Sequence, residues 1–229
     1  MVLLGDACKG VAVSFYIGRE DALLVVDLQN DFLRGGALAV AGGNEILPGV
    51  NRLMEFFHRR GGRIVLTQDW HPADHLSFAS QHEGRKPFEA IEGLDGIGPI
   101  LWPDHCVQGS PGASLAPLLN ASLAHLVIRK GIHRRIDSYS TFFENDGKTP
   151  TGLAGYLREI GVSRIFLCGL ALDYCVFWSA MDGRKKGFEV NVITDLCRGI
   201  GTQSSIEALR EMTAAGVVFV HAENFSGTG

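Results

Sequence analysis

A carboxylate and two imidazoles occur within one short segment of this 229-residue chain, at Asp69, His71 and His75. The segment follows an apolar run at residues 63–67, so these side chains are expected to emerge together where a strand ends. Imidazole nitrogens and carboxylate oxygens are common ligands of Zn, Fe(II) and Mn(II). His105 is a fourth candidate that only the fold can bring in. The spacing predicts a site for one divalent ion, and a polar turn rich in Asp and Pro is the alternative.

Cys175 is the candidate nucleophile of the chain. It lies at the predicted start of a helix, where unpaired N–H groups and the helix dipole favour a thiolate and can lower the thiol pKa. A nearby Lys130 would act in the same direction, and Asp27 could accept the thiol proton. The alternatives are structural, namely a buried apolar cysteine, a solvated lysine and an aspartate that caps a turn. Together the three residue types predict covalent catalysis.

Six short apolar runs predict strands, each followed by a polar break and usually by a segment with helical period. The predicted strands cover residues 22–26, 63–67, 126–129, 164–170, 190–194 and 217–220. Helices are predicted over residues 47–60, 152–160, 174–186 and 203–215, and a glycine follows each of them. Strands that are apolar at consecutive positions suit a sheet covered on both faces. The fold class is therefore α/β, a three-layer α/β/α sandwich with a mainly parallel sheet of about six strands.

Chemically capable residues follow four of the predicted strands: Asp27, Asp69, Lys130 and Cys175. In open α/β sheets, ligands bind beyond the carboxyl ends of the strands. All four side chains are therefore expected at one rim of the sheet. Residues 76–113 contain few regular signals and many Gly, Pro and charged residues, so they predict a long functional excursion from the sheet.

Composition favours a small-molecule role. The net charge of −4 and the pI near 6.0 give no basic surface that would favour nucleic acid or a membrane as partner. Five widely separated cysteines form no disulfide framework and indicate a reducing compartment, so the cytoplasm is expected. We find no signal peptide and no phosphate-binding motif. Residues 1–20 are interpreted as an N-terminal extension of unknown role, and residues 21–229 as one domain.

Six segments carry a resemblance to a known family. They are Val-Asp-Leu-Gln-Asn-Asp-Phe (26–32), Gln-Asp-Trp-His-Pro-Ala-Asp-His (68–75), Trp-Pro-Asp-His-Cys-Val-Gln-Gly (102–109), Lys-Gly (130–131), Asp-Ser-Tyr-Ser-Thr-Phe-Phe (137–143) and Gly-Leu-Ala-Leu-Asp-Tyr-Cys-Val (169–176). In this order they resemble the motifs of nicotinamidases, within the isochorismatase-like cysteine hydrolases. The likeness runs from about Ala22 to the final predicted strand.

The resemblance implies roles for individual residues. It implies a catalytic triad of Asp27, Lys130 and Cys175, and a metal site of Asp69, His71, His75 and His105 in which the ion faces the substrate's pyridine nitrogen. It also implies an oxyanion hole made by the N–H groups of Ala171 and Cys175, with a cis bond between Leu170 and Ala171. Aromatic pocket walls correspond to Phe32, Trp102 and Tyr139. Leu172, which stands where many members carry Thr, is implied to be a further substrate-binding residue.

The resemblance also implies an activity. Nicotinamide would be hydrolysed to nicotinate and ammonia through a cysteine thioester, in NAD salvage, and pyrazinamide is expected to be a further substrate. The ion would be zinc in the first instance, with Fe or Mn as alternatives, and the sequence leaves the oligomeric state open. Three other functions remain: an amidase of the same superfamily acting on carbamoyl or ureido groups, a metallohydrolase in which Cys175 is structural, and a metal-storing or thiol-sensing binding protein.

Overall fold

The computed structural model describes residues 15–92 and 96–225, and in this part of the chain six strands form one sheet. The strands are β1 (Asp21–Val26), β2 (Arg63–Asp69), β3 (Leu126–Lys130), β4 (Arg164–Leu170), β5 (Glu189–Arg198) and β6 (Val218–Val220). Their order in the sheet is β3-β2-β1-β4-β5-β6, and every neighbouring pair is parallel. The predicted parallel sheet is confirmed.

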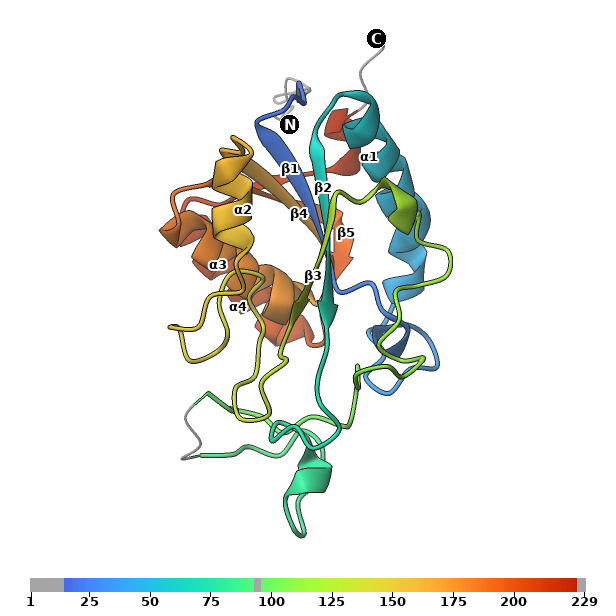
Figure 1. The fold of residues 1–229 in the computed structure, drawn as a ribbon, viewed down its shortest axis with the longest axis vertical. Helices are drawn as coiled ribbons and strands as arrows, with labels where there is room; N and C mark the ends of the chain where they lie inside the picture. Colours follow the sequence, from blue (N-terminus) through green and yellow to red (C-terminus); the bar gives the residue numbers. More distant parts are fainter. Residues whose placement is uncertain (1–14, 93–95, 226–229) are drawn as a thin grey trace, which may run out of the picture.

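Helices cover both faces of the sheet, as Figure 1 shows. The helix α1 (Leu47–Arg59) lies on one side, whereas α2 (Leu153–Glu159), α3 (Phe177–Lys185) and α4 (Thr202–Ala214) lie on the other. This is the predicted three-layer α/β/α arrangement. None of the helices among the described residues is long and apolar enough to cross a membrane.

Helix α1 illustrates how apolar spacing fixes these layers. Its buried side chains recur at intervals of three and four residues, so they share one face of the helix. Phe57 on this face is fully buried and packs edge-on against Phe166 of β4, with ring centroids 5.4 Å apart. On the sheet itself, all six residues of β1 are buried. The first four residues of β3 alternate between partly buried and exposed positions because β3 is an edge strand, and only its last residue, Lys130, is buried.

The predicted extension at residues 1–20 falls largely outside the described residues, which begin at Phe15. Phe15 stacks on Phe225 with ring centroids 5.5 Å apart, and Ile17 is 1% exposed within the core. The backbone N–H of Phe15 also donates to the carbonyl of Asn224. These residues pack with the core of the sheet. The division of the chain into an extension and a single domain stays a prediction.

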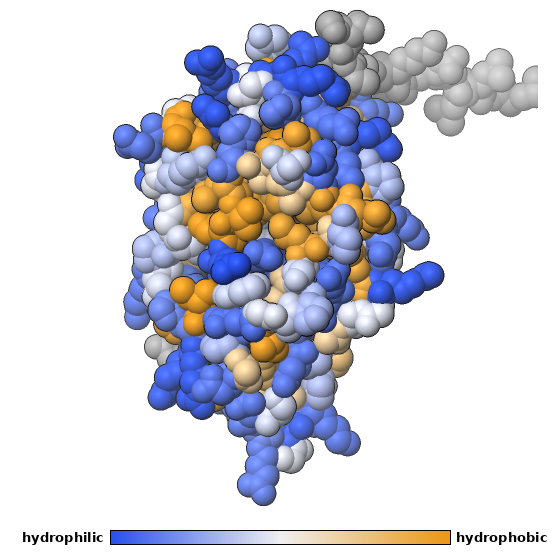
Figure 2. Space-filling model, turned by 45° about the vertical axis from the view of Figure 1, so that its right-hand side comes forward, coloured by the Kyte–Doolittle hydropathy of each residue, from blue (hydrophilic) through white to orange (hydrophobic). Residues whose placement is uncertain are grey.

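Two local departures from the predicted elements bear on the site. The predicted helix at residues 174–186 begins with a π-helical turn, Leu172–Val176, and becomes α-helical only at Phe177. Between β2 and β3, the described residues contain only short 3-10 turns, as expected for a long excursion. The excursion forms the lower end of the molecule in Figure 1, and that end is mostly hydrophilic in Figure 2.

Candidate active site

The candidate site forms where four neighbouring strands end. Because β3, β2, β1 and β4 are consecutive in the sheet, the residues that follow them are brought side by side. Asp69 and Lys130 are register partners at the ends of β2 and β3. Asp27 follows β1, and Cys175 lies just beyond the end of β4. The rim predicted from the sequence therefore exists.

Lys130 joins the candidate catalytic residues. Its Nζ lies 3.0 Å from Oδ2 of Asp27 and 3.4 Å from Sγ of Cys175. It also contacts the carboxylate of Asp69 and donates to the carbonyl of Ser138 at 2.9 Å. Lys130 and Asp27 are fully buried, and Cys175 is 7% exposed. The interpretation of Lys130 as a solvated surface charge is therefore wrong.

Asp27 is held by a residue that the sequence did not single out. The Oγ1 of Thr67 accepts a hydrogen bond from the Asp27 backbone N–H at 3.0 Å and donates to its side-chain Oδ1. Asp27 does not cap the following 3-10 turn, Asn30–Phe32, which has no side-chain cap. Thr67 directs Oδ2 of Asp27 toward Lys130 instead. Its signal in the sequence is a hydroxyl residue within an otherwise apolar strand.

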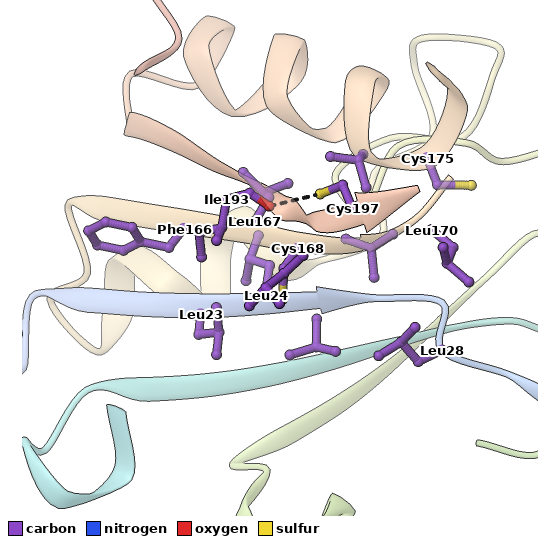
Figure 3. Close-up of a cluster of buried hydrophobic side chains, with 14 of the residues drawn as sticks. Leu23, Leu24, Leu28, Phe166, Leu167, Cys168, Leu170, Cys175, Ile193 and Cys197 are labelled. Carbon is purple, nitrogen blue, oxygen red and sulfur yellow. Dashed lines mark hydrogen bonds between the residues drawn. The ribbon is translucent and has the colours of Figure 1, made fainter. Parts of the chain in front are cut away.

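Cys175 differs from the other buried cysteines in its position. Cys168 and Cys197 lie among core side chains, whereas Cys175 lies beyond the strand ends in Figure 3. The bond between Leu170 and Ala171, just before the π-helical turn, is cis, as expected. The carbonyl of Ala171 accepts the N–H groups that flank Cys175 in the turn. The oxyanion hole at Ala171 and Cys175 stays a prediction.

Burial dominates the protonation of these groups. It raises the pKa of the Cys175 thiol well above its ordinary value, and the Lys130 ammonium opposes this only in part. Burial also raises the pKa of Asp27, again against Lys130. For Lys130 itself, burial would lower the pKa, but Asp27 and Asp69 raise it well above the usual range. The pKa of the Cys175 thiol is therefore raised beside the Lys130 ammonium, in place of the lowered thiol pKa expected at a helix start.

Three of the four predicted metal ligands converge. One ligand atom each from Asp69, His71 and His105 lies within 4.8 Å of the others. The Nε2 atoms of His71 and His105 lie 3.7 Å and 3.9 Å from Oδ2 of Asp69, too far for hydrogen bonds. Donor atoms about 2.0–2.2 Å from a common ion would be spaced in this way. The group therefore fits a divalent ion.

The second ring nitrogen of each histidine supports the same fit. Nδ1 of His71 lies 2.9 Å from the carbonyl of Gly131, and Nδ1 of His105 lies 2.8 Å from that of Pro103. Donation to these carbonyls leaves both Nε2 lone pairs free for an ion. Gly131 is required here, because its φ is +66° and a Cβ would lie 2.4 Å from Cε1 of His71. Burial lowers the pKa of His105 to about 4, which keeps this ring neutral.

His75 lies beside this group and outside it. Its ring centroid is 4.4 Å from that of His71, but its Nδ1 lies 2.7 Å from Oγ of Ser77 and its Nε2 lies 3.2 Å from the carbonyl of Ile136. His75 forms a separate group of possible ligands with His71 and Asp137. Sequence reasoning gave Asp137 no role. A direct role for His75 in binding the same ion as His105 stays a prediction.

Aromatic side chains border the site, and three of them were predicted to line the pocket. Trp102 and Tyr139 are both buried and pack edge-on, with centroids 6.3 Å apart. Tyr174, beside the nucleophile, packs against both of them at 5.0 Å and 5.4 Å, and the sequence analysis assigned it no role. Phe32 lies against His105 at 5.6 Å. These faces suit a flat ring.

Leu172 and Gln29 complete the site; the first was predicted from the sequence and the second was not. Leu172, a predicted pocket residue, is 9% exposed and opens the π-helical turn that contains Cys175. Gln29, which the sequence analysis overlooked, is fully buried and binds the backbone of Asp69 on both sides. Its Oε1 accepts the Asp69 N–H at 2.8 Å, and its Nε2 donates to the carbonyls of Asp69 at 2.8 Å and Ala113 at 2.9 Å. Gln29 therefore fixes the direction in which the Asp69 carboxylate points.

Replacing Gln29 with methionine is expected to weaken metal binding by about 10- to 100-fold, because it frees the backbone that orients Asp69. The affinity can be measured by competition with a chromogenic chelator. Gln68→Met is the matched control, since Gln68 donates to the same Ala113 carbonyl at 2.9 Å without contacting the Asp69 backbone through its side chain. Equal affinities of the two variants would contradict this role for Gln29.

The comparisons with known proteins agree on one family. The model of the isochorismatase domain matches residues 21–224. A nicotinamidase of Acinetobacter baylyi is 49% identical over 89% of this chain and 93% of its own. The structure of PnC1 from L. infantum in complex with nicotinate is similar with a TM-score of 0.80 and 40% identity, covering 92% of this chain and 98% of that one. The pyrazinamidase of Pyrococcus horikoshii in complex with zinc has a TM-score of 0.73 and 39% identity, covering 88% and 99%.

The match to the isochorismatase domain extends over the whole described sheet and over all six motif segments. The nicotinamidase and the two solved structures exceed 30% identity and cover almost all of their own length. The chain therefore belongs to the isochorismatase domain family, and it shares high sequence identity with nicotinamidases of that family.

Proposed function

We propose that this protein is a nicotinamidase, which hydrolyses nicotinamide to nicotinate and ammonia and so serves NAD salvage. The observation that carries the proposal is the position of Asp69. One oxygen of its carboxylate contacts Lys130 of the candidate triad, and the other faces the imidazoles of the candidate metal site. A nucleophile and a cation site joined by one carboxylate suit a substrate with an amide on a basic ring. The nicotinamidase from Acinetobacter baylyi and the nicotinate complex from L. infantum support the same substrate.

In the acylation step, Asp27 accepts the proton of the Cys175 thiol and the sulfur attacks the carboxamide carbon. The raised pKa of Asp27 makes its carboxylate a better proton acceptor. Lys130 lies beside both groups and stabilises the negative charge as it moves between them. The N–H groups of Ala171 and Cys175 are proposed to bind the oxyanion. The protonated Asp27 then gives its proton to the leaving nitrogen, ammonia departs, and a thioester remains.

In the deacylation step, Asp27 accepts a proton from a water molecule that attacks the thioester carbon. The bond between that carbon and Sγ of Cys175 breaks, and the sulfur recovers its proton from Asp27. The sum is one water consumed, with one nicotinic acid and one ammonia formed. The product ionises to nicotinate in solution. General acid–base help of this kind contributes about 10²- to 10⁴-fold.

The metal is proposed to be held by Asp69, His71 and His105, with His75 as a further ligand. Zinc is the first candidate, supported by the zinc-bound pyrazinamidase of Pyrococcus horikoshii, and the donor set also suits iron or manganese. When bound, the ion supplies a Lewis acid for the lone pair of a ring nitrogen. Trp102, Tyr139 and Phe32 are proposed to hold the ring between that point and Cys175.

A direct assay tests the function. Purified protein is expected to release ammonia from nicotinamide, and from pyrazinamide as well, with a thiol- and metal-dependent rate. Removing the metal with a chelator should lower kcat/KM for nicotinamide roughly tenfold or more, which is about 1.4 kcal/mol of transition-state stabilisation. Adding back zinc, iron or manganese should restore the rate and identify the preferred ion. Failure to release ammonia from either amide would reject the proposal.

A further inference from the structure

Asp137 is a buried carboxylate with one unused oxygen. It is 2% exposed, and its Oδ1 accepts the N–H of Ser138 at 2.8 Å. Its Oδ2 has no hydrogen-bond partner among the described residues. A buried carboxylate oxygen without a partner is costly, because the charge has lost its water. Such an oxygen therefore calls for a cation or another positively polarised group.

The groups that face Asp137 are imidazoles. Ligand atoms of Asp137, His71 and His75 all lie within 4.8 Å of one another, and all three residues are buried. Two ligand atoms of one ion lie at most about 4.4 Å apart when each bond is about 2.2 Å. To complete this group, the side chains move slightly inward and His75 gives up one of its two contacts, of which the 3.2 Å contact of Nε2 with the carbonyl of Ile136 is the longer. We call it the second donor group, and we call Asp69, His71 and His105 the first donor group. The two groups share His71.

We propose that Asp137 is a metal-site residue, and that the second donor group is an alternative binding position for a divalent cation next to the first. His71 belongs to both groups, and its Nδ1 is hydrogen-bonded to the carbonyl of Gly131. The two binding positions therefore compete for the one remaining nitrogen of His71, Nε2. The site therefore takes one ion per chain, drawn from five donor side chains. This inference rests on the metal site within the proposed function.

Position along the chain links the second donor group to the catalytic centre. Asp137 precedes Ser138, whose carbonyl accepts a hydrogen bond from Lys130, and Tyr139 of the aromatic wall follows. A cation bound by Asp137 would therefore restrain residues 137–139, which contact Lys130 and line the proposed pocket. Because both binding positions lie at the same rim of the sheet, the position of the ion would affect the shape of that pocket.

Metal-stripped protein titrated with zinc against a competing chelator tests the proposal without turnover. Asp137→Asn keeps the size of the side chain and removes a negative charge that lies within 4.8 Å of the His71 ligand atom, and His71 belongs to both donor groups. It is therefore expected to lower zinc affinity at least tenfold, with one ion bound per wild-type chain. The control is Asp21→Asn, because Asp21 is equally buried but lies at the other end of β1, paired with Arg164. Unchanged affinity in Asp137→Asn, or two tightly bound ions in the wild type, would overturn the proposal.

A second variant gives a spectroscopic answer that does not depend on affinity. In Asp137→Cys loaded with cobalt(II), ligation by residue 137 is expected to add a thiolate-to-metal charge-transfer band that the wild type lacks. Its absence in folded, cobalt-loaded protein would contradict a ligand at this position. Nicotinamide hydrolysis by the wild type is measured separately. Lack of hydrolysis with these metal effects intact would reject the proposed function and leave the second donor group standing.

Discussion

Replacement of Cys175 by alanine is expected to lower kcat/KM for nicotinamide by at least about 10⁴-fold, because it removes the proposed nucleophile. Cys168 and Cys197 are enclosed in the core, and Cys106 is fully buried at the excursion next to His105. The metal site should survive, since none of its candidate ligands is changed. Steady-state ammonia release and zinc stoichiometry measure the two effects independently.

The control for this variant is Cys197→Ala, which removes a buried thiol from the core and leaves the rim intact. It should retain wild-type kcat/KM apart from any loss of stability. Mass spectrometry of acid-quenched wild type should detect a nicotinoyl adduct on Cys175, as expected for a thioester. Substantial turnover by Cys175→Ala would instead support hydrolysis by metal-activated water and overturn the covalent mechanism.

Replacement of Lys130 by methionine is expected to affect both stability and activity. The substitution leaves the carboxylates of Asp27 and Asp69 buried without their shared cation, so unfolding free energy should fall by about 3–5 kcal/mol. Turnover should fall by about 10²-fold or more, because the charge passed between Cys175 and Asp27 is no longer stabilised. Denaturant unfolding and ammonia release provide the measurements.

Two further variants separate charge from packing. Lys148→Met removes an exposed lysine and should leave stability within about 0.5 kcal/mol of the wild type. Adding Asp27→Asn to Lys130→Met removes one of the two stranded carboxylates, so the double variant should recover part of the lost stability. If Lys130→Met were as stable as the Lys148 variant, the account of a buried ion pair would be wrong.

The elements could be predicted largely from the order of apolar and polar residues. Strands such as β1 are apolar at every position because they are covered on both faces, and that pattern is local in the sequence. The glycine after each helix likewise marks its end, as at Gly61 after α1. The placement of Asp27, Asp69 and Lys130 after strands followed from the same patterns. The start of α3 did not follow from them, because a π-helical turn, Leu172–Val176, precedes this helix. That turn depends on how the chain leaves β4 and places Cys175 beyond the strand.

The residues that hold the site in place were harder to foresee. Thr67, Gln29 and Tyr174 each look ordinary in the sequence, and each acts through a contact with a residue distant along the chain or on another element. Asp137 stood in a motif without a role, although its carboxylate has an oxygen without a hydrogen-bond partner and lies close to ligand atoms of His75 and His71. His75 was predicted to bind the same ion as His105, yet it lies in the second donor group with His71 and Asp137.

By itself, the amino-acid sequence determined which chemical groups follow the strands and that a parallel, two-sided sheet would carry them, since both are set by local residue types and spacing. Only the tertiary structure decided that β3, β2, β1 and β4 are neighbours, and so that Lys130 meets Asp27 and Cys175. It also decided that Asp69 faces both the ammonium and the imidazoles. Strand order and the direction of buried polar side chains depend on contacts between distant segments, and no local pattern encodes them.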